Sequence, residues 1–247
     1  MLRESLIIEL DSIDSTNNYA MQLIDANKAQ PGMTIVAQNQ WAGKGQRGNI
    51  WVDAPGKSLS MSIIAAPKQA IREQFVFSAS VAIAIANVLR NLHSNWNVYI
   101  KWPNDIIVND KKAGGILIEN VLRGSNWTHS VIGIGLNVQQ EKFPGNLPHA
   151  ISLKMASGND IDITKLRDDI RESIMACSLF PQPPGQIMGR YNQFLYRRGM
   201  KQRFSNSSEK WEATIQNAHD DGTLEVQKED GSVEFYNHGQ AVWEWGE

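Results

Sequence analysis

The 247-residue sequence contains one cysteine, Cys177, so no internal disulfide framework is available to the fold. This cysteine lies in the helix-like run ITKLRDDIRESIMACSLF, which favours a core thiol over a nucleophile. The most apolar stretch, FVFSASVAIAIANVL, is shorter than a membrane span, and the charged first fifteen residues argue against a secretory signal. We therefore expect a cytoplasmic protein that has no membrane partner.

The sequence also lacks a strong net charge. Its 24 Lys and Arg residues stand against 26 Asp and Glu residues, which argues against a general nucleic-acid binder. Residues 1–198 carry 20 basic against 16 acidic side chains, whereas residues 199–247 carry 4 against 10, so an anionic ligand belongs with the first part. The five histidines show neither metal-ligand spacing nor the arrangement of a catalytic triad.

Hydrophobic periodicity predicts an α+β fold with a β-rich end. Strands are expected near 6–10, 33–38, 58–65, 97–102 and 129–138, with a hairpin over 106–122 that turns at NDKK. Helices are expected from Asp14 or Ser15 to about Asn27 and over 73–93, 164–180 and 186–197, with a loop-rich stretch at 139–160. The turns DDG and EDG join short strands after residue 199, which predicts domains at 1–198 and 199–247.

A glycine-rich stretch, QNQWAGKGQRGNIW, has the G-x-G-x-x-G spacing of a dinucleotide-binding turn at residues 43, 45 and 48. That motif needs a helix after the glycines and an acidic residue further on, and neither follows. GKS at 56–58 also fails as a phosphate-binding loop, because Trp51 stands where its first glycine is required. Lys44 and Arg47 nevertheless suit a backbone that approaches an anion.

The stretch KWPNDIIVNDKKAGGILIEN holds a second concentration of chemistry-bearing residues. Asn104 and Asp105 suit a turn after Pro103, and this stretch can be interpreted as turn chemistry alone. We expect Lys101 and Lys112 to lie on strands that the hairpin makes neighbours, with a glycine pair between them, as in an anion pocket. Glycines 133 and 135 alternate along a later strand, which indicates close approach by backbone or ligand.

Five blocks of the sequence together resemble biotin protein ligases: DSTN (14–17), GKGQRGNIW (43–51), KWPNDI (101–106), KKAGGILIE (111–119) and GIGLNV (133–138). The resemblance implies a mixed, mostly antiparallel sheet with packed helices, similar to class II aminoacyl-tRNA synthetases, and a small C-terminal SH3-like β-barrel. It implies a two-step reaction in which biotin and Mg-ATP give biotinoyl-5'-AMP and pyrophosphate. A lysine of a biotin carboxyl carrier domain, of acetyl-CoA carboxylase or a similar carboxylase, then accepts the biotin.

The resemblance also implies roles for individual residues. The implied biotin-binding residues are Ser15, Thr16, Asn17, Gln40, Gly43, Lys44, Gly45, Gln46, Lys112 and Gly115. The implied ATP-binding residues are Lys44, Arg47, Trp51, Lys101, Asn104 and Asn137, with Trp51 stacking on adenine. The implied catalytic residues are Lys101, Lys112, Asp105 and Arg47, and Asp105 is a candidate Mg²⁺ ligand. The loop 43–48 is expected to be a lid that orders on biotin or its adenylate.

One residue departs from the family pattern. Many members have arginine where this chain has Gln46, so retention of the adenylate is in question, whereas the reaction class is not. The first predicted strand begins by Leu6, so the ligase form without an N-terminal DNA-binding domain is expected, as a monomer or homodimer that binds no DNA. The alternatives are a lipoate or octanoate ligase or transferase, and a module that binds biotin without catalysis.

Overall fold

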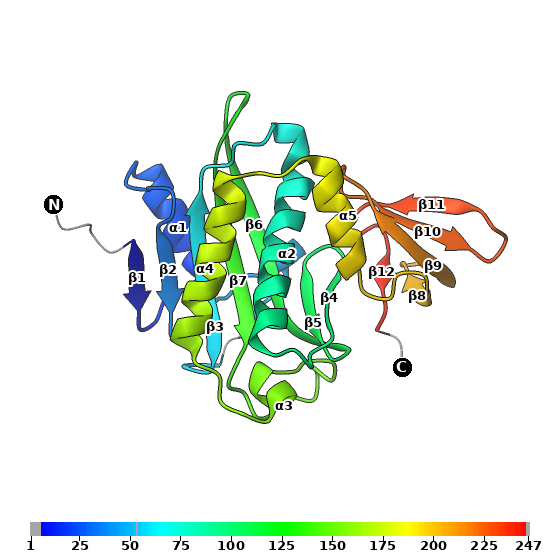
Figure 1. The fold of residues 1–247 in the computed structure, drawn as a ribbon, viewed down its shortest axis with the longest axis horizontal. Helices are drawn as coiled ribbons and strands as arrows, with labels where there is room; N and C mark the ends of the chain where they lie inside the picture. Colours follow the sequence, from blue (N-terminus) through cyan, green and yellow to red (C-terminus); the bar gives the residue numbers. More distant parts are fainter. Residues whose placement is uncertain (1–5, 53, 246–247) are drawn as a thin grey trace.

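A computed structural model describes residues 6–52 and 54–245 of the chain, which form two β-sheets and the helices packed on them (Figure 1). The strands of the larger sheet are β1 (Ile7–Leu10), β2 (Thr34–Ala37), β3 (Ser58–Ala65), β4 (Val98–Lys101), β5 (Asp105–Val108), β6 (Lys111–Arg123) and β7 (Asn126–Asn137). The smaller sheet contains β8 (Lys201–Ser205), β9 (Lys210–Ala218), β10 (Leu224–Lys228), β11 (Val233–Tyr236) and β12 (Val242–Trp243). The α-helices are α1 (Thr16–Asp25), α2 (Gln74–Leu92), α3 (Leu153–Ser157), α4 (Ile163–Leu179) and α5 (Pro184–Phe194). Short 3₁₀ turns η1 (Gln46–Gly48) and η2 (Ile71–Glu73) complete the elements.

The larger sheet has the strand order β1-β2-β3-β7-β6-β5-β4. Only β1 and β2 pair in parallel, and every other neighbouring pair is antiparallel. The expected mixed, mostly antiparallel sheet is therefore confirmed. The long strands β6 and β7 form its centre and extend into a hairpin beyond the helices (Figure 1).

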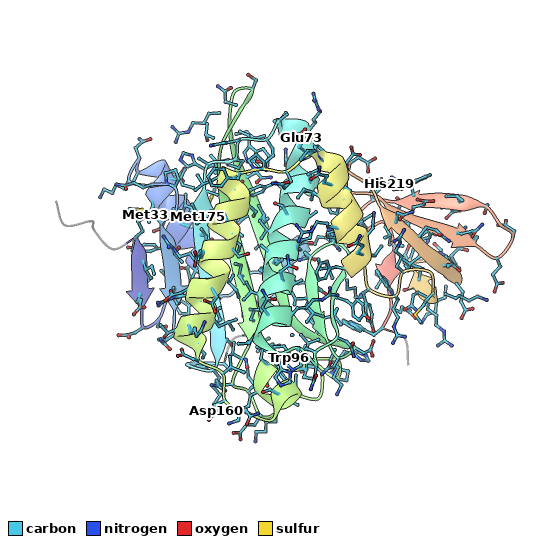
Figure 2. All side chains as sticks on the ribbon, viewed as in Figure 1. Met33, Glu73, Trp96, Asp160, Met175 and His219 are labelled. Carbon is cyan, nitrogen blue, oxygen red and sulfur yellow. The ribbon has the colours of Figure 1, made fainter. Side chains whose placement is uncertain are left out.

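The two faces of this sheet are covered differently. Helices α2, α4 and α5 lie on one face, where Phe77 and Ile85 of α2 are fully buried with Ile132 of β7 (Figure 1). Met175 of α4 lies on the β2 side of this layer (Figure 2). On the other face α1 packs mainly on β2, β3 and β7, through a small cluster that includes Ile24, and its Asn17 also hydrogen-bonds to β6. The rest of that second face is left for a site.

Residues 71–92 show one difference from the sequence interpretation. This helical segment is long and apolar enough, by length and composition, to cross a membrane, although we expected it to be too short. In the structure 61% of its most apolar window is buried, and its side chains pack on the sheet as in a core helix.

The smaller sheet, ordered β11-β10-β9-β8-β12, follows α5 and packs beside β4 and β5 (Figure 1). This second sheet is consistent with the expected SH3-like module. Asn192 of α5 holds it by a pair of hydrogen bonds with the backbone of Ala218. The boundary at residue 198 itself stays a prediction.

The stretch 139–160 is loop-rich, as expected, and also contains the short helix α3, which Ser152 caps by accepting a hydrogen bond from the Met155 amide. Two further expectations are corrected. Strands β4 and β6 are not neighbours, because β5 lies between them, so Lys101 and Lys112 are separated by one strand. Cys177, expected in the core, is half-buried at its edge, where burial raises the pKa of the thiol.

Candidate active site

A row of paired residues runs across six strands on the face that α1 leaves open. The register pairs Ala37 with Ser60, Ser60 with Gly135, Gly135 with Gly115, Gly115 with Asp105, and Asp105 with Lys101. Side chains at one level of a sheet point to the same face, so the small members of this row leave a trough. Asp105 and Lys101 stand at the end of that trough.

Four members of this row, Gly135, Gly115, Asp105 and Lys101, line a cavity of about 530 Å³ and form its floor. All the predicted site residues line it except Gly43 and Asn137. The amide of Asn137 instead donates to the Ile151 carbonyl near α3, and a side chain at Gly43 would collide with the Trp51 backbone. Gly43 therefore allows close packing within the loop, and neither residue touches the cavity.

One end of the cavity is lined by the uncharged polar side chains of Ser15, Thr16, Asn17 and Gln40. Together with the buried Ser62 we call these residues the polar end. The Thr16 amide donates to Gln40 Oε1 at 2.9 Å, and Thr16 Oγ1 lies 3.2 Å from the same oxygen. The Ser62 hydroxyl lies 2.7 Å from Thr16 Oγ1 and 2.6 Å from Asn17 Oδ1. Ser15 occupies the cap position of α1, but among the described residues its side chain makes no capping hydrogen bond. The hydrogen bonds of Thr16 join α1 to the segment after β2 and to β3.

The alternating glycines of β7 receive two side chains of the site. A Cβ on Gly133 would come within 2.3 Å of the Asn17 amide oxygen, and one on Gly135 would come within 2.5 Å of the Trp51 indole. The close approach that the sequence predicted is therefore made by site side chains. Because Gly135 is bare, the Trp51 ring lies against the sheet and forms part of the cavity wall.

The opposite end carries the cations, and we call it the cationic end: Arg47, Lys101, Asp105 and Lys112. Lys112 Nζ lies 2.7 Å from Asp105 Oδ1. Lys101 is only 8% exposed, and its Nζ donates to the Trp243 carbonyl at 3.0 Å. Burial lowers the pKa of Lys101 to about 8; Asp105 opposes that shift, and Lys112 adds to it. Two lysines and a carboxylate thus converge although β5 separates the strands of the lysines.

The smaller sheet supplies part of this end. Three side chains of the larger domain donate to its backbone carbonyls: Arg47 to His238 at 2.6 Å, Lys101 to Trp243, and Trp102 to Gly222 at 3.1 Å. The Lys101 ammonium also lies 5.0 Å and 4.7 Å from the ring centroids of Trp243 and Trp245, within cation–π range.

The contact at Arg47 is closely fitted. A Cβ on Gly239 would occupy the position of the Arg47 guanidinium, so only glycine allows this contact. Burial lowers the pKa of the neighbouring His238; Arg47 adds to that shift, and Asp105 opposes it. The residues of the smaller sheet that line the cavity were not predicted from the sequence: His238, Gly239, Ala241, Val242 and Trp243.

The glycine loop is folded as a short hairpin over this cavity. Gly45 and Trp51 donate from their amides to the carbonyls of Asn49 and Gly43, at 2.7 and 2.9 Å. Lys44 Nζ lies 3.9 Å from Glu119 Oε1, toward the polar end, whereas Arg47, with φ of 55°, turns toward the smaller sheet. The two cations of the loop therefore serve opposite ends of the cavity. The ligand-dependent ordering of this loop stays a prediction.

The described residues contain no group of three or more His, Cys, Asp or Glu side chains that could hold a metal ion. The carboxylate of Asp105, the predicted Mg²⁺ ligand, faces the Lys112 ammonium.

Comparison with known proteins gives one family. Residues 9–137 match the family model described as the Biotin/lipoate A/B protein ligase family. The chain is 34% identical over 174 residues to the bifunctional ligase/repressor BirA of Bacillus spizizenii, covering 69% of this chain and 52% of that protein. It is 28% identical over 165 residues to the biotin–[acetyl-CoA-carboxylase] ligase of Paracoccus denitrificans, covering 63% of this chain and 65% of that protein. The chain spans about half the length of the BirA proteins that it matches.

The fold also has solved counterparts. The biotin protein ligase of Aquifex aeolicus, solved in complex with biotin and ATP, superposes with a TM-score of 0.80 at 21% identity. The alignment covers 98% of this chain and all of that one, so the likeness extends through both sheets.

Proposed function

The chain belongs to the biotin/lipoate A/B protein ligase family, and from this premise we propose that it is an ATP-dependent biotin–protein ligase. The observation that carries the proposal is a single cavity whose one end is neutral and hydrogen-bonding and whose other end is cationic. Biotinoyl-5'-AMP has the same division, with a neutral cyclic urea at one end and, at the far end of its acyl chain, a phosphate that carries adenosine. The named ligases among the relatives support this assignment.

The polar end suits the ring system of biotin. Ser15 and Thr16 are buried at this end, and their hydroxyl oxygens can accept a hydrogen bond from a ring N–H group. A lipoyl or octanoyl chain has no urea and offers them no such donor. This difference favours biotin over the cargo of the other branch of the family.

The cationic end suits the activation of a carboxylate by ATP. A carboxylate oxygen of biotin attacks the α-phosphorus, the bond from that phosphorus to the bridging oxygen breaks, and pyrophosphate leaves with Mg²⁺. The ionised carboxylate needs no base, so the protein contributes position and positive charge around the phosphates. Lys101 and Lys112 supply that charge, and Trp51 supplies a flat ring for adenine. A module that only binds biotin has no need of these cations.

The second step transfers biotin to a lysine of a carrier domain. The lysine amine attacks the acyl carbon of the adenylate, the acyl–oxygen bond breaks, AMP leaves, and the new amide loses one proton. We assign the hold on the incoming amine to Asp105, whose carboxylate lies in the cavity 2.7 Å from Lys112 Nζ. The acceptor is a biotin carboxyl carrier domain of acetyl-CoA carboxylase or a similar enzyme, and the chain acts in the cytoplasm as a monomer or homodimer.

Incubation of the chain with biotin and Mg-ATP tests the proposal, with mass detection of the adenylate and assay of pyrophosphate. The expected result is biotinoyl-5'-AMP and pyrophosphate in equal amounts, followed by biotin on an added carrier domain. Adenylate formation with octanoate or lipoate but not with biotin would assign the chain to the other branch. Tight biotin binding without pyrophosphate would leave only a binding module.

A further inference from the structure

Glu119 is a carboxylate that the proposed reaction does not use. It lies on β6 two residues beyond Leu117, which lines the cavity, and four beyond Gly115, so all three point to the same face. Its Oε2 accepts a hydrogen bond of 2.6 Å from the Asn17 amide nitrogen, and its Oε1 lies 3.9 Å from Lys44 Nζ. Glu119 therefore lies behind the polar end, where it contacts Asn17 of α1 and Lys44 of the glycine loop.

The charge of Glu119 sets the direction of the hydrogen bonds in the polar end. An ionised carboxylate only accepts, so the amide of Asn17 must donate to it and turn its oxygen toward Ser62. That oxygen also only accepts, so the Ser62 hydroxyl donates its one proton to Asn17. The chain of donors thus runs from Ser62 through Asn17 to Glu119.

The direction of this chain decides what the cavity offers at Thr16. Since the Ser62 proton is used on Asn17, the 2.7 Å contact between Ser62 Oγ and Thr16 Oγ1 needs the Thr16 proton, and the lone pairs of Thr16 Oγ1 remain for a ligand. The polar end therefore presents an acceptor at Thr16 Oγ1. A cargo that places a ring N–H there is matched, and a plain acyl chain is not.

We propose that Glu119 is a positioning residue that selects a cargo with a ring N–H group by fixing the donor direction of Ser62 and Asn17. The inference rests on the proposed function, because it takes the polar end to be the biotin end. Glu119 acts through Asn17 and Ser62 and is not among the residues that line the cavity.

Glu119→Gln tests the inference. Glutamine keeps the size of the side chain, but its amide can donate to Asn17 and so reverse the direction of the hydrogen bonds that run from Ser62 through Asn17. We expect the KM for biotin to rise about tenfold or more, the loss typical of a charge-assisted hydrogen bond, with kcat and the KM for ATP within about twofold. Binding of octanoate, which has no N–H, should not change. Glu141→Gln is the matched control, since Glu141 is a surface carboxylate paired with Lys154 at 2.8 Å. An unchanged KM for biotin, or equal losses for biotin and octanoate, would overturn the inference.

A second route from Glu119 passes through Lys44, and the double variant separates it. In a Lys44→Met background, Glu119→Gln should weaken biotin by the same factor; if its effect disappears, Lys44 and not the Asn17 chain carries it, and the inference is wrong. If Glu119→Gln does not fold, Ser62→Ala breaks the same chain one bond further on and should give the same selective loss of biotin.

The outcomes also separate this inference from the proposed function. A wild-type chain that binds biotin but makes no adenylate contradicts the proposed reaction, while biotin affinity still tests Glu119. A wild-type chain that does not bind biotin contradicts both.

Discussion

The two ends of the cavity are built in different ways. The polar end is held by the larger sheet and α1, where α1, β3, β6 and the segment after β2 supply groups that hydrogen-bond to one another, as the Thr16 amide and Gln40 do. The cationic end is shared: Arg47 and Lys101 complete their hydrogen bonds on the backbone of the smaller sheet. The geometry of the polar end depends on the register of the larger sheet. The geometry of the cationic end depends on where the smaller sheet packs against the larger one.

This difference has a functional consequence. A preformed end that is internally satisfied recognises cargo without rearrangement, since little conformational entropy remains to be lost there. An end whose cations are held by a neighbouring sheet keeps concentrated positive charge in place until phosphates arrive. Substitutions at the polar end should therefore weaken biotin binding, whereas substitutions at the cationic end should weaken ATP use and catalysis.

The largest effect is expected from Lys112→Ala. Removing the charge beside Asp105 should slow adenylate formation about 10²–10³-fold, the cost of one charged contact in the transition state, while biotin binding stays close to wild type. Pyrophosphate release and biotin titration measure the two quantities. Lys111→Ala is the control, because Lys111 directly precedes Lys112 on β6 and is exposed. An equal loss of biotin affinity would show that the two ends do not separate.

A change in the floor should act on the nucleotide. Gly135→Ala places a Cβ 2.5 Å from the Trp51 ring and must displace it, so we expect the KM for ATP to rise about tenfold, as overpacking of 1–3 kcal/mol implies. Gly189→Ala is the matched control, since a Cβ at that helical position has open space. Steady-state kinetics at saturating biotin gives the answer, and an unchanged KM for ATP would remove Trp51 from nucleotide binding.

The pH dependence should report the buried lysine. Burial lowers the pKa of Lys101 to about 8, so its charge is present below that pH and is lost as the pH rises through it. We expect kcat/KM for ATP, which reports the free enzyme, to fall through an alkaline limb near pH 8. Trp245→Leu removes a cation–π contact at 4.7 Å that favours the charged lysine, and should move this limb about 0.4–0.7 units lower. A limb at the ordinary pKa of lysine would contradict the assignment.

The smallest effect is expected in the loop. Gln46 lines the cavity, and its Oε1 is buried without a hydrogen-bond partner in the part of the chain that the structure describes. Gln46→Arg adds a charge near the phosphate and should slow release of the adenylate several-fold, by about 1 kcal/mol for a partly exposed charge. Chasing bound adenylate with excess unlabelled biotin and ATP measures that rate. A release rate equal to wild type would mean that the arginine does not reach the phosphate.

Much of this arrangement can be predicted from the sequence, because it follows from the types of side chain and from the spacing of apolar residues. The strands and the long helices follow from apolar spacing, and Lys101, Asp105 and Lys112 stand out because charges flank short apolar runs around glycines. The alternation of Gly133 and Gly135 also predicts a close approach, although the sequence does not say what approaches.

The rest depends on contacts that leave no mark in the sequence. The smaller sheet contributes through the carbonyls of Gly222, His238 and Trp243, and every residue has such a carbonyl. Hairpin connectivity suggested that Lys101 and Lys112 lie on adjacent strands, but β5 intervenes and the bulge between Ile106 and Ile107 sets the final register. Asn137 belongs to a sequence block that resembles the family, yet its side chain hydrogen-bonds to the Ile151 carbonyl near α3 and does not line the cavity.

The most direct test of the two-ended cavity is a crystal structure of the chain with biotinoyl-5'-AMP bound. The urea ring is predicted to lie against Thr16 and Gly133, the phosphate between Lys101 and Lys112, and the adenine on Trp51. An adenylate bound in the reverse direction, or with its phosphate away from both lysines, would contradict the assignment of the two ends.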